Sequence, residues 1–148
     1  MHIKVKHIVL CGHTGCGGCL GALSDSRIGG VLDAWLTPLK SVRMANEAEL
    51  KGIRDDKARA KRLAELNVER GVEVLLSSYV VEEAVRERGL QVHGVLYDIG
   101  CGKIRELGCG SKGKGGVPGQ KVVEEGEIVK GNHGMLVFGG DGASMAIR

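Results

Sequence analysis

The amino-acid sequence predicts an α/β fold, in which a parallel sheet is flanked by helices and ends in an antiparallel C-terminal hairpin strand. Two apolar runs typical of strands, residues 3–11 and 90–98, are separated by a long stretch of helical pattern. Two strands that are joined by a helical crossover pair in parallel within one sheet. A turn at 99–102 and an alternating segment at 103–107 then predict a hairpin, whose returning strand is antiparallel.

The first predicted strand leads into a loop that is rich in glycine and cysteine. The strand becomes continuously apolar, as a strand covered on both faces does, and we expect it to stop at Gly12. The loop continues to Gly17 and Gly18, and residues 19–23 fit a short helix. Residues 24–30 contain serine, aspartate and two glycines, so they interrupt the helical pattern.

The stretch between the two strands is predicted to be mainly helical. A helix fits residues 31–43, and because it contains Pro38 we expect a kink or a boundary near Thr37. Residues 47–70 mix both signs of charge and indicate one or two surface helices with a solvated face, and residues 72–88 continue as helix. In the first of these helices, one face is apolar and consists of Val31, Leu32, Trp35, Leu36 and Leu39.

The distribution of glycine divides the chain into two parts. Of the 25 glycines in 148 residues, seven lie in residues 11–30 and twelve in residues 108–148. We therefore predict a domain over residues 1–107 and a glycine-rich tail over residues 108–148, which is mobile or adds a strand near 135–138. Two further short strand candidates in the tail are residues 121–123 and 128–129.

Composition argues against several classes of protein. No apolar run approaches the roughly 18 residues that cross a bilayer, and the N-terminal residues do not form a signal peptide. The net charge of +3, with no dense basic block beside aromatic side chains, gives nucleic-acid binding little support. We expect no membrane contact and a cytoplasmic location, or a mitochondrial one if a leader segment precedes Met1.

Three of the five cysteines fall within nine residues, in the run Cys-Gly-His-Thr-Gly-Cys-Gly-Gly-Cys at 11–19. This odd number of cysteines, without an export signal, favours reduced thiols that bind metal or perform redox chemistry over disulfides. Thiolate and imidazole are ligands that zinc prefers. We predict that His13 and Cys16, at the carboxyl end of a strand, bind a metal ion. They are two ligands, whereas a catalytic zinc takes three from the protein.

The neighbouring residues have simpler interpretations. Cys11 ends an apolar strand, so we expect it to be buried as a small hydrophobic side chain, and we expect Cys19 to pack inside as well. A redox pair formed by Cys16 and Cys19 is an alternative that the preceding His13 and the two intervening glycines weaken. His93 lies on an apolar strand and is expected to be hydrogen-bonded in the interior.

At residues 9–18, Val-Leu-Cys-Gly-His-Thr-Gly-Cys-Gly-Gly, the sequence resembles the β-class carbonic anhydrases. The resemblance covers residues 3–107 and implies a parallel α/β sheet, a homodimer or larger homo-oligomer, and a zinc ion bound by Cys, His and Cys. His13 and Cys16 match two of these ligands. The implied function is the zinc-dependent reversible hydration of carbon dioxide to bicarbonate, a lyase reaction. Three further blocks carry the resemblance in the same order: 30–36, 65–68 and 92–98.

The family's preceding motif, Cys-x-Asp-x-Arg, has no counterpart ahead of His13, so relative to the family we expect the chain to be truncated at its N-terminus. That motif supplies the remaining zinc ligand and an Asp–Arg dyad that orients the zinc-bound hydroxide. Residues 24–27, Ser-Asp-Ser-Arg, look similar but follow His13 and have serine in place of the ligand, so we interpret them as a loop. Replacements for the missing ligand are Cys19, Cys101 or Cys109, from this chain or a partner.

Three hypotheses follow from this pattern. The chain is a short, working carbonic anhydrase with a substituted ligand, or a catalytically impaired relative that binds zinc or dimerises, or an incomplete product of a longer enzyme. The residues alone leave these three open, together with the size of the oligomer and the role of residues 108–148.

Overall fold

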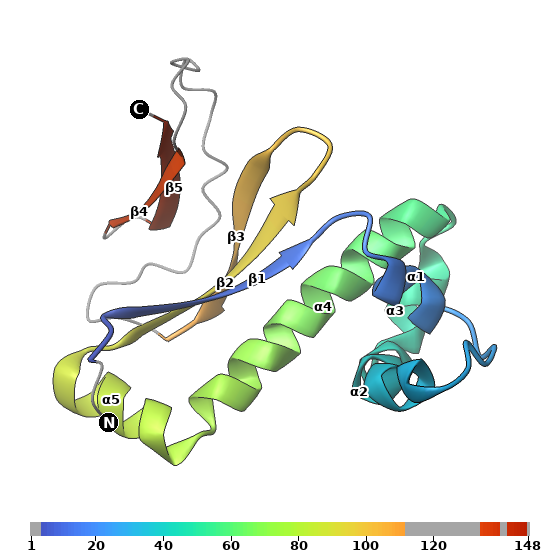
Figure 1. Cartoon of the computed structure of the whole chain (residues 1–148), viewed down its shortest axis with the longest axis horizontal. Helices are drawn as coiled ribbons and strands as arrows, with labels where there is room; N and C mark the ends of the chain where they lie inside the picture. Colours follow the sequence, from blue (N-terminus) through green and yellow to red (C-terminus); the bar gives the residue numbers. More distant parts are fainter. Residues whose placement is uncertain (1–3, 112–133, 140–141, 148) are drawn as a thin grey trace.

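The structure has the predicted α/β architecture, in which helices pack on a three-stranded mixed sheet (Figure 1). It is a computed structural model, and it describes residues 4–111, 134–139 and 142–147. The first two strands pair in parallel and the third returns antiparallel to the second, as predicted. In their order across the sheet, the strands are β1 (His7–His13), β2 (Gln91–Asp98) and β3 (Lys103–Gly110).

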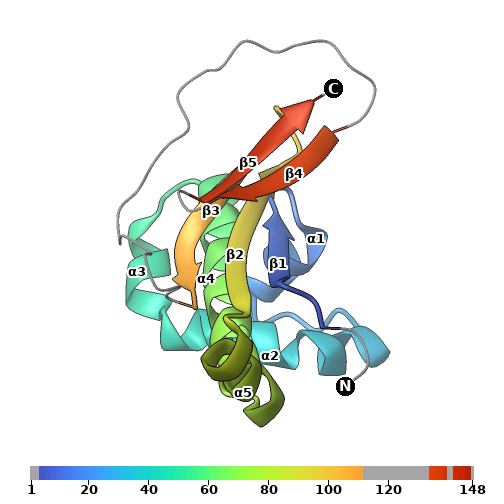
Figure 2. The same ribbon diagram turned by 90° about the vertical axis from the view of Figure 1, so that its left-hand side faces the viewer.

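The segment between β1 and β2 is helical, and its longest helix organises the others. Figures 1 and 2 show helix α4 lying along one face of the sheet, with α1, α2 and α3 gathered near one of its ends and α5 at the other. Helix α4 contacts all three strands and each of the other helices. The helices are α1 (Gly17–Ala22), α2 (Val31–Ala45), α3 (Glu47–Gly52), α4 (Asp56–Leu76) and α5 (Tyr79–Arg88).

Two of the predicted boundaries, the end of the first strand and the boundary near Thr37, differ in the structure because of strand pairing and core packing. Strand β1 does not stop at Gly12, because both Gly12 and His13 still pair with β2. Helix α2 continues through Pro38, so the boundary expected near Thr37 is absent. The core contacts of Leu36 and Leu39, on either side of the proline, stabilise the helix despite the missing amide donor.

The helix predicted over residues 72–88 is broken into two. Helix α4 ends at Leu76, and the Ser78 carbonyl accepts hydrogen bonds from the Val81 and Glu82 amides at the start of α5. The break changes the direction of the chain before β2, as Figure 1 shows. Apolar periodicity continues across such a turn, so it carried no signal of the break.

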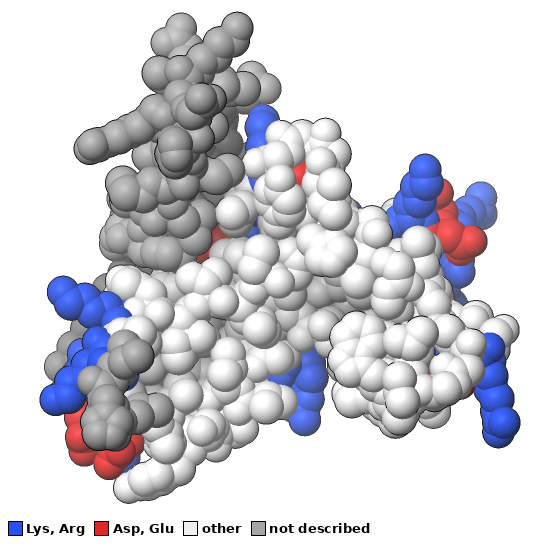
Figure 3. Space-filling view, in the orientation of Figure 1, with Lys and Arg blue, Asp and Glu red and all other residues white. Residues whose placement is uncertain are grey.

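Most of the apolar face predicted for α2 is exposed. Leu36 is buried, but Val31 is 83% and Trp35 is 70% exposed. Over the side of α2 that is visible in Figure 3, the surface is mainly uncharged, with Lys or Arg at its margins. Helical periodicity identifies which side chains share a face, but it does not say whether another element covers that face.

The core lies between α4 and the sheet, and close approach requires glycine where they cross. A Cβ atom on Gly12 would lie 2.6 Å from Cγ2 of Val68 and 3.5 Å from the carbonyl oxygen of Ala64. A Cβ atom on Gly94 would lie 3.0 Å from Cγ1 of Val68. Within the charged segment 47–70, Leu50, Leu63, Leu66 and Val68 are buried, whereas Ile53 is half-buried.

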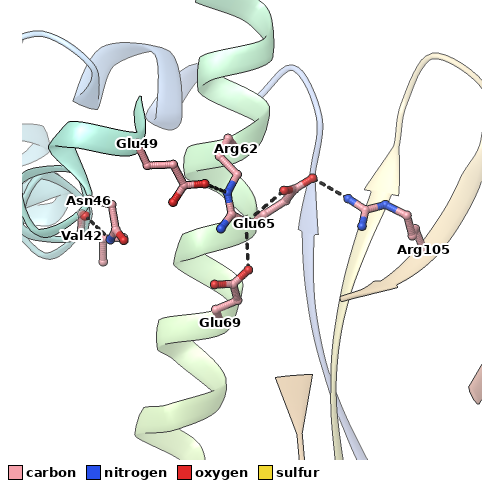
Figure 4. A network of polar contacts seen from close by, with 7 residues as sticks. All are labelled: Val42, Asn46, Glu49, Arg62, Glu65, Glu69 and Arg105. Atoms are coloured by element: carbon pink, nitrogen blue, oxygen red, sulfur yellow. Dashed lines mark hydrogen bonds and ion pairs between the residues drawn. The ribbon is translucent and has the colours of Figure 1, made fainter. Parts of the chain in front are cut away.

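Part of the charged surface of α4 forms a network rather than a freely solvated face (Figure 4). Arg62 donates hydrogen bonds to Glu49 on α3 at 2.5 Å, to Glu65 at 3.2 Å and to Glu69 at 3.0 Å. Arg105 on β3 donates to Glu65 at 2.5 Å. The hydrogen bond to Glu49 is the largest cause that raises the pKa of Arg62. The network therefore links α3, α4 and the edge strand β3.

The C-terminal segment contains the predicted strand near residues 135–138. It is β4 (Gly134–Gly139), which pairs antiparallel with β5 (Gly142–Ile147) in a separate two-stranded sheet, and β5 contacts β3. The strand candidates at 121–123 and 128–129 lie outside the described residues. Strand β3 extends to Gly110, and the predicted division of the chain after residue 107 stays a prediction. Among the helices of the described ranges, none has the length and apolarity needed to span a membrane.

The close packing at Gly12 leads to a first prediction. The substitution Gly12→Ala should lower the free energy of unfolding by about 1–3 kcal/mol, because its methyl group enters a well-packed core at Val68. Gly52→Ala is the matched control, since nothing lies within 4 Å of a Cβ atom at that helical position. Chemical denaturation of both variants measures the difference, and equal effects would contradict the packing described here.

Candidate metal centre

The predicted ligands His13 and Cys16 lie on one short loop at the carboxyl end of β1. His13 is the last residue of the strand, and Cys16 is the N-cap residue of α1. Between them, Gly15 has a φ of +67°, a left-handed conformation that glycine adopts without steric cost. The loop therefore lies where open α/β sheets place their ligand sites, beyond the carboxyl ends of parallel strands.

The backbone orients the exposed ring of His13. Its Nδ1 lies 2.9 Å from the carbonyl oxygen of Thr14. A carbonyl oxygen only accepts, so Nδ1 is the donor in this hydrogen bond. A neutral imidazole in this tautomer offers Nε2 as a metal donor, with its other nitrogen already held in place.

The two thiols at the start of α1 differ in burial. Cys16 is half-buried, whereas Cys19 is 3% exposed and packs in the core beside Ala22 and Leu63, which confirms its predicted packing role. Burial, together with the neighbouring Cys16, raises the pKa of the Cys19 thiol to about 12. Because the thiolate is the form that binds metal, Cys19 in this state is a poor ligand.

The prediction that Cys11 is buried was wrong. Leu10 and Gly12 face α4, since Leu10 lies against Gly71 and Gly12 against Val68. Side chains alternate along a strand, so Cys11 points to the opposite face, where it is exposed and its thiol donates to the carbonyl of Gly12 at 3.3 Å. The apolar run showed that the strand is largely covered, but it did not show which residue faces outward.

The remaining candidate ligands lie on other elements. Cys101 is exposed in the turn between β2 and β3. Cys109 on β3 is half-buried against the core cluster that contains Val68 and Val72, and burial raises the pKa of its thiol. Within the described ranges, no group of three or more His, Cys, Asp or Glu side chains is arranged to hold a metal ion.

Residues 24–27 form a loop, as interpreted from the sequence, and they do not form an Asp–Arg pair. The carboxylate of Asp25 forms an ion pair with Arg43 on α2 rather than with Arg27, and its side chain is 88% exposed. This ion pair holds the loop of residues 24–27 against helix α2. The segment has no strand or helix of its own.

His93 is hydrogen-bonded in the interior, as predicted, but its partners were not foreseen. Its Nε2 lies 3.2 Å from Nδ1 of His7 on β1, and its Nδ1 lies 3.2 Å from Oε1 of Glu106 on β3. These three side chains come from the three different strands and lie on the same face of the sheet as Cys11. Their juxtaposition depends on strand register, which a single sequence does not specify.

Comparison with known proteins identifies relatives of the chain. The family profile described as carbonic anhydrase matches residues 1–104. A carbonic anhydrase of Candida albicans is 42% identical over 106 residues, which make up 71% of this chain and 38% of that protein. A carbonic anhydrase of Emericella nidulans is 39% identical over 107 residues, or 72% of this chain and 46% of that protein. The chain therefore spans less than half the length of these two relatives.

Solved structures are similar over the same part of the chain. A tetrameric β-carbonic anhydrase of Sordaria macrospora superposes with a TM-score of 0.73 and 62% identity, covering 75% of this chain and 56% of that one. The β-carbonic anhydrase of Coccomyxa, solved in complex with acetazolamide, gives a TM-score of 0.69 with 35% identity, covering 76% of this chain and 51% of that one.

The burial of the thiols leads to a second prediction. Iodoacetamide at about pH 8 should alkylate Cys19 at least about 10-fold more slowly than Cys101, because a thiol with a pKa of about 12 is almost wholly protonated and is also shielded. Mass spectrometry of peptides after timed quenching measures both rates. In denaturant the two rates should converge, and equal rates in the folded chain would contradict the buried, protonated state of Cys19.

Proposed function

The chain belongs to the β-class carbonic anhydrase family, and from that premise we propose that it binds zinc through His13 and Cys16 and hydrates carbon dioxide reversibly to bicarbonate. The observation that carries the proposal is the loop at the end of β1. It presents an imidazole whose Nδ1 is already committed to the Thr14 carbonyl, and a thiol three residues later. Nitrogen and sulfur donors of this kind suit zinc better than magnesium or calcium.

The residues of the loop fit zinc in kind, and each has a defined part. His13 would offer Nε2, and Cys16, which is only half-buried, would bind as a thiolate after losing its proton. A zinc ion held there supplies a Lewis acid that lowers the pKa of water to about 7, the general basis of zinc hydration chemistry. Gly15 and Gly17 leave the loop without bulky side chains, so a small substrate can approach it.

We propose that the third protein ligand of the zinc ion comes from a second chain. A catalytic zinc site takes three protein ligands, and the described residues place two on the loop. Cys19 is adjacent but buried and protonated, whereas Cys109 packs toward α4. Cys101 is exposed, so its thiol is accessible to a second chain.

A second candidate function is zinc binding without efficient turnover. It is favoured by the loop at residues 24–27, where Asp25 pairs with Arg43 and so does not act with Arg27 as a dyad. Without an acceptor that positions the attacking oxygen, a loss on the order of 10²-fold or more in rate is expected. In this case the chain would retain the metal site and lose most of the catalysis.

We also propose that the chain forms a homo-oligomer. The similar enzyme of Sordaria macrospora is described as tetrameric. In the single chain, Val31 and Trp35 of α2 are 83% and 70% exposed, and exposed large apolar side chains on one helix favour contact with another protein surface. A second copy that covers α2 would remove this apolar surface from water.

The central prediction concerns zinc and turnover measured on the same sample. The purified 148-residue chain should contain one zinc ion and accelerate carbon dioxide hydration in stopped-flow measurements. Substitution of a residue that only supports a metal ligand weakens metal binding about 10–100-fold. His13→Ala removes a ligand itself, so it should weaken zinc binding by more than this and abolish the catalysed rate. His7→Ala, at the opposite end of β1, is the control and should keep its zinc.

The outcomes separate the candidate functions. Stoichiometric zinc with a catalysed rate that His13→Ala abolishes supports the enzyme. Stoichiometric zinc without a catalysed rate supports the second candidate function. A chain that binds no zinc, or whose zinc content is unaffected by His13→Ala, contradicts both.

A further prediction concerns the two thiols of the loop. Cys16→Ala should lose the zinc ion, whereas Cys19→Ala should retain one zinc per chain, because Cys19 is buried in the core. Metal analysis after removal of free zinc measures both, and circular dichroism confirms that each variant is folded. A loss of zinc in both variants would identify Cys19 as the third ligand.

A further inference from the structure

We propose that Thr14 and Asp98 are positioning residues that hold the metal-binding loop and select the nitrogen that His13 offers. We call this pair the Thr14–Asp98 latch. The inference rests on the zinc site proposed above, and it assigns a role to two residues that are 84 positions apart in the sequence. Neither residue needs to touch the metal ion or the substrate for this role.

The latch joins the carboxyl ends of the two parallel strands. The last paired residues of β1 and β2 are His13 and Tyr97, and the Thr14 amide then donates to the Tyr97 carbonyl at 2.9 Å. The Thr14 hydroxyl donates to Oδ1 of Asp98 at 3.3 Å and accepts from the Ile99 amide at 3.1 Å. Thr14 is therefore held by its backbone and by both hydrogen-bonding roles of its hydroxyl group.

Asp98 is itself held in place by the turn that follows β2. Its Oδ1 accepts from the Gly100 amide at 2.9 Å, and its carbonyl accepts from the Gly102 amide at 2.8 Å. The carboxylate thus connects the hairpin turn with the loop after β1. Because the turn belongs to a paired hairpin, Asp98 is a rigid point to which the metal-binding loop is attached.

The orientation of Thr14 passes directly to the predicted ligands. The Thr14 carbonyl is the acceptor for Nδ1 of His13, so the plane of the Thr14 peptide decides where the imidazole points and which nitrogen stays unprotonated. Cys16 follows after Gly15 alone, a residue with wide conformational freedom. Anchoring Thr14 therefore limits the movement of both donors, which is how residues around a metal ligand raise its affinity.

A purely structural role for the same hydrogen bonds predicts something different. If the latch only closed a turn, removing it would lower the stability of the fold and leave the zinc affinity of the folded chain unchanged. A positioning role lowers the zinc affinity and changes the protonation pattern of His13 even where the chain stays folded. The two roles are therefore separated by measuring stability and metal binding on the same variants.

The first test uses zinc affinity of the full chain, measured by competition with a chromophoric chelator. Thr14→Val removes the hydroxyl group at nearly constant volume and should weaken zinc binding about 10–100-fold. Asp98→Ala should do the same, and the double variant should lose less affinity than the two single losses multiplied together, because both substitutions break the shared hydrogen bond between Thr14 and Asp98. Thr14→Ser and Asp98→Asn keep the donor and the acceptor and should bind zinc nearly as the natural chain does.

A matched control is available on α2. The hydroxyl of Thr37 donates to the Asp33 carbonyl at 2.9 Å, so Thr37→Val also removes one threonine hydrogen bond. It should leave zinc affinity unchanged, while chemical denaturation reports the stability of all variants. Zinc affinity that is the same in Thr14→Val, Thr37→Val and the natural chain would overturn the latch.

A second readout requires no metal. In the metal-free chain at alkaline pH, long-range ¹H–¹⁵N correlation spectra report which ring nitrogen of His13 carries the proton. The natural chain and Thr37→Val should show the proton on Nδ1, and Thr14→Val should shift it toward Nε2. An unchanged tautomer in Thr14→Val would contradict the latch.

The two readouts keep the inference separate from the proposed function. Loss of the Nδ1 tautomer in Thr14→Val, in a chain that binds no zinc, would support the latch and refute the zinc site. Zinc binding that depends on His13 but not on Thr14 would support the zinc site and refute the latch.

Discussion

The close approach of helix α4 to the sheet is the constraint on which the rest of this structure depends. Gly12 lies against Val68, and Gly71 of α4 lies against Leu10, so the helix and β1 touch where side chains are absent. A larger residue at Gly12 would move α4, and with it the helices and strands that α4 contacts. Because Gly12 directly precedes His13, the same contact also sets the direction in which β1 enters the candidate metal-binding loop.

Strand alternation then determines which chemistry reaches the surface. With Gly12 turned toward α4, Cys11 and His13 must point to the opposite face, where both are exposed. Cys19 on α1 lies in the core, where burial and the neighbouring Cys16 raise the pKa of its thiol to about 12. Packing therefore separates the protonated, internal thiol of Cys19 from the accessible side chains of His13 and Cys16.

The candidate site is organised mainly by backbone groups at the ends of two parallel strands. The ring of His13 is held by a carbonyl of its own loop, and that loop is held by the amide and hydroxyl of Thr14. Such an arrangement requires β1 and β2 to end at the same level, which their parallel register provides. The helical crossover that α4 dominates is what makes this parallel pairing available.

The sequence by itself determined most of the strands and helices and the candidate ligands His13 and Cys16, because periodicity and residue spacing are local properties. It predicted both parallel strands, the hairpin and the helical crossover. Tertiary structure decided what covers each face: Cys11 is exposed although its apolar strand predicted burial, and Trp35 is exposed on the apolar face of α2. It also decided which distant groups meet, as Thr14 and Asp98 do across 84 positions. Register and packing involve residues far apart in the chain, so no local pattern contains them.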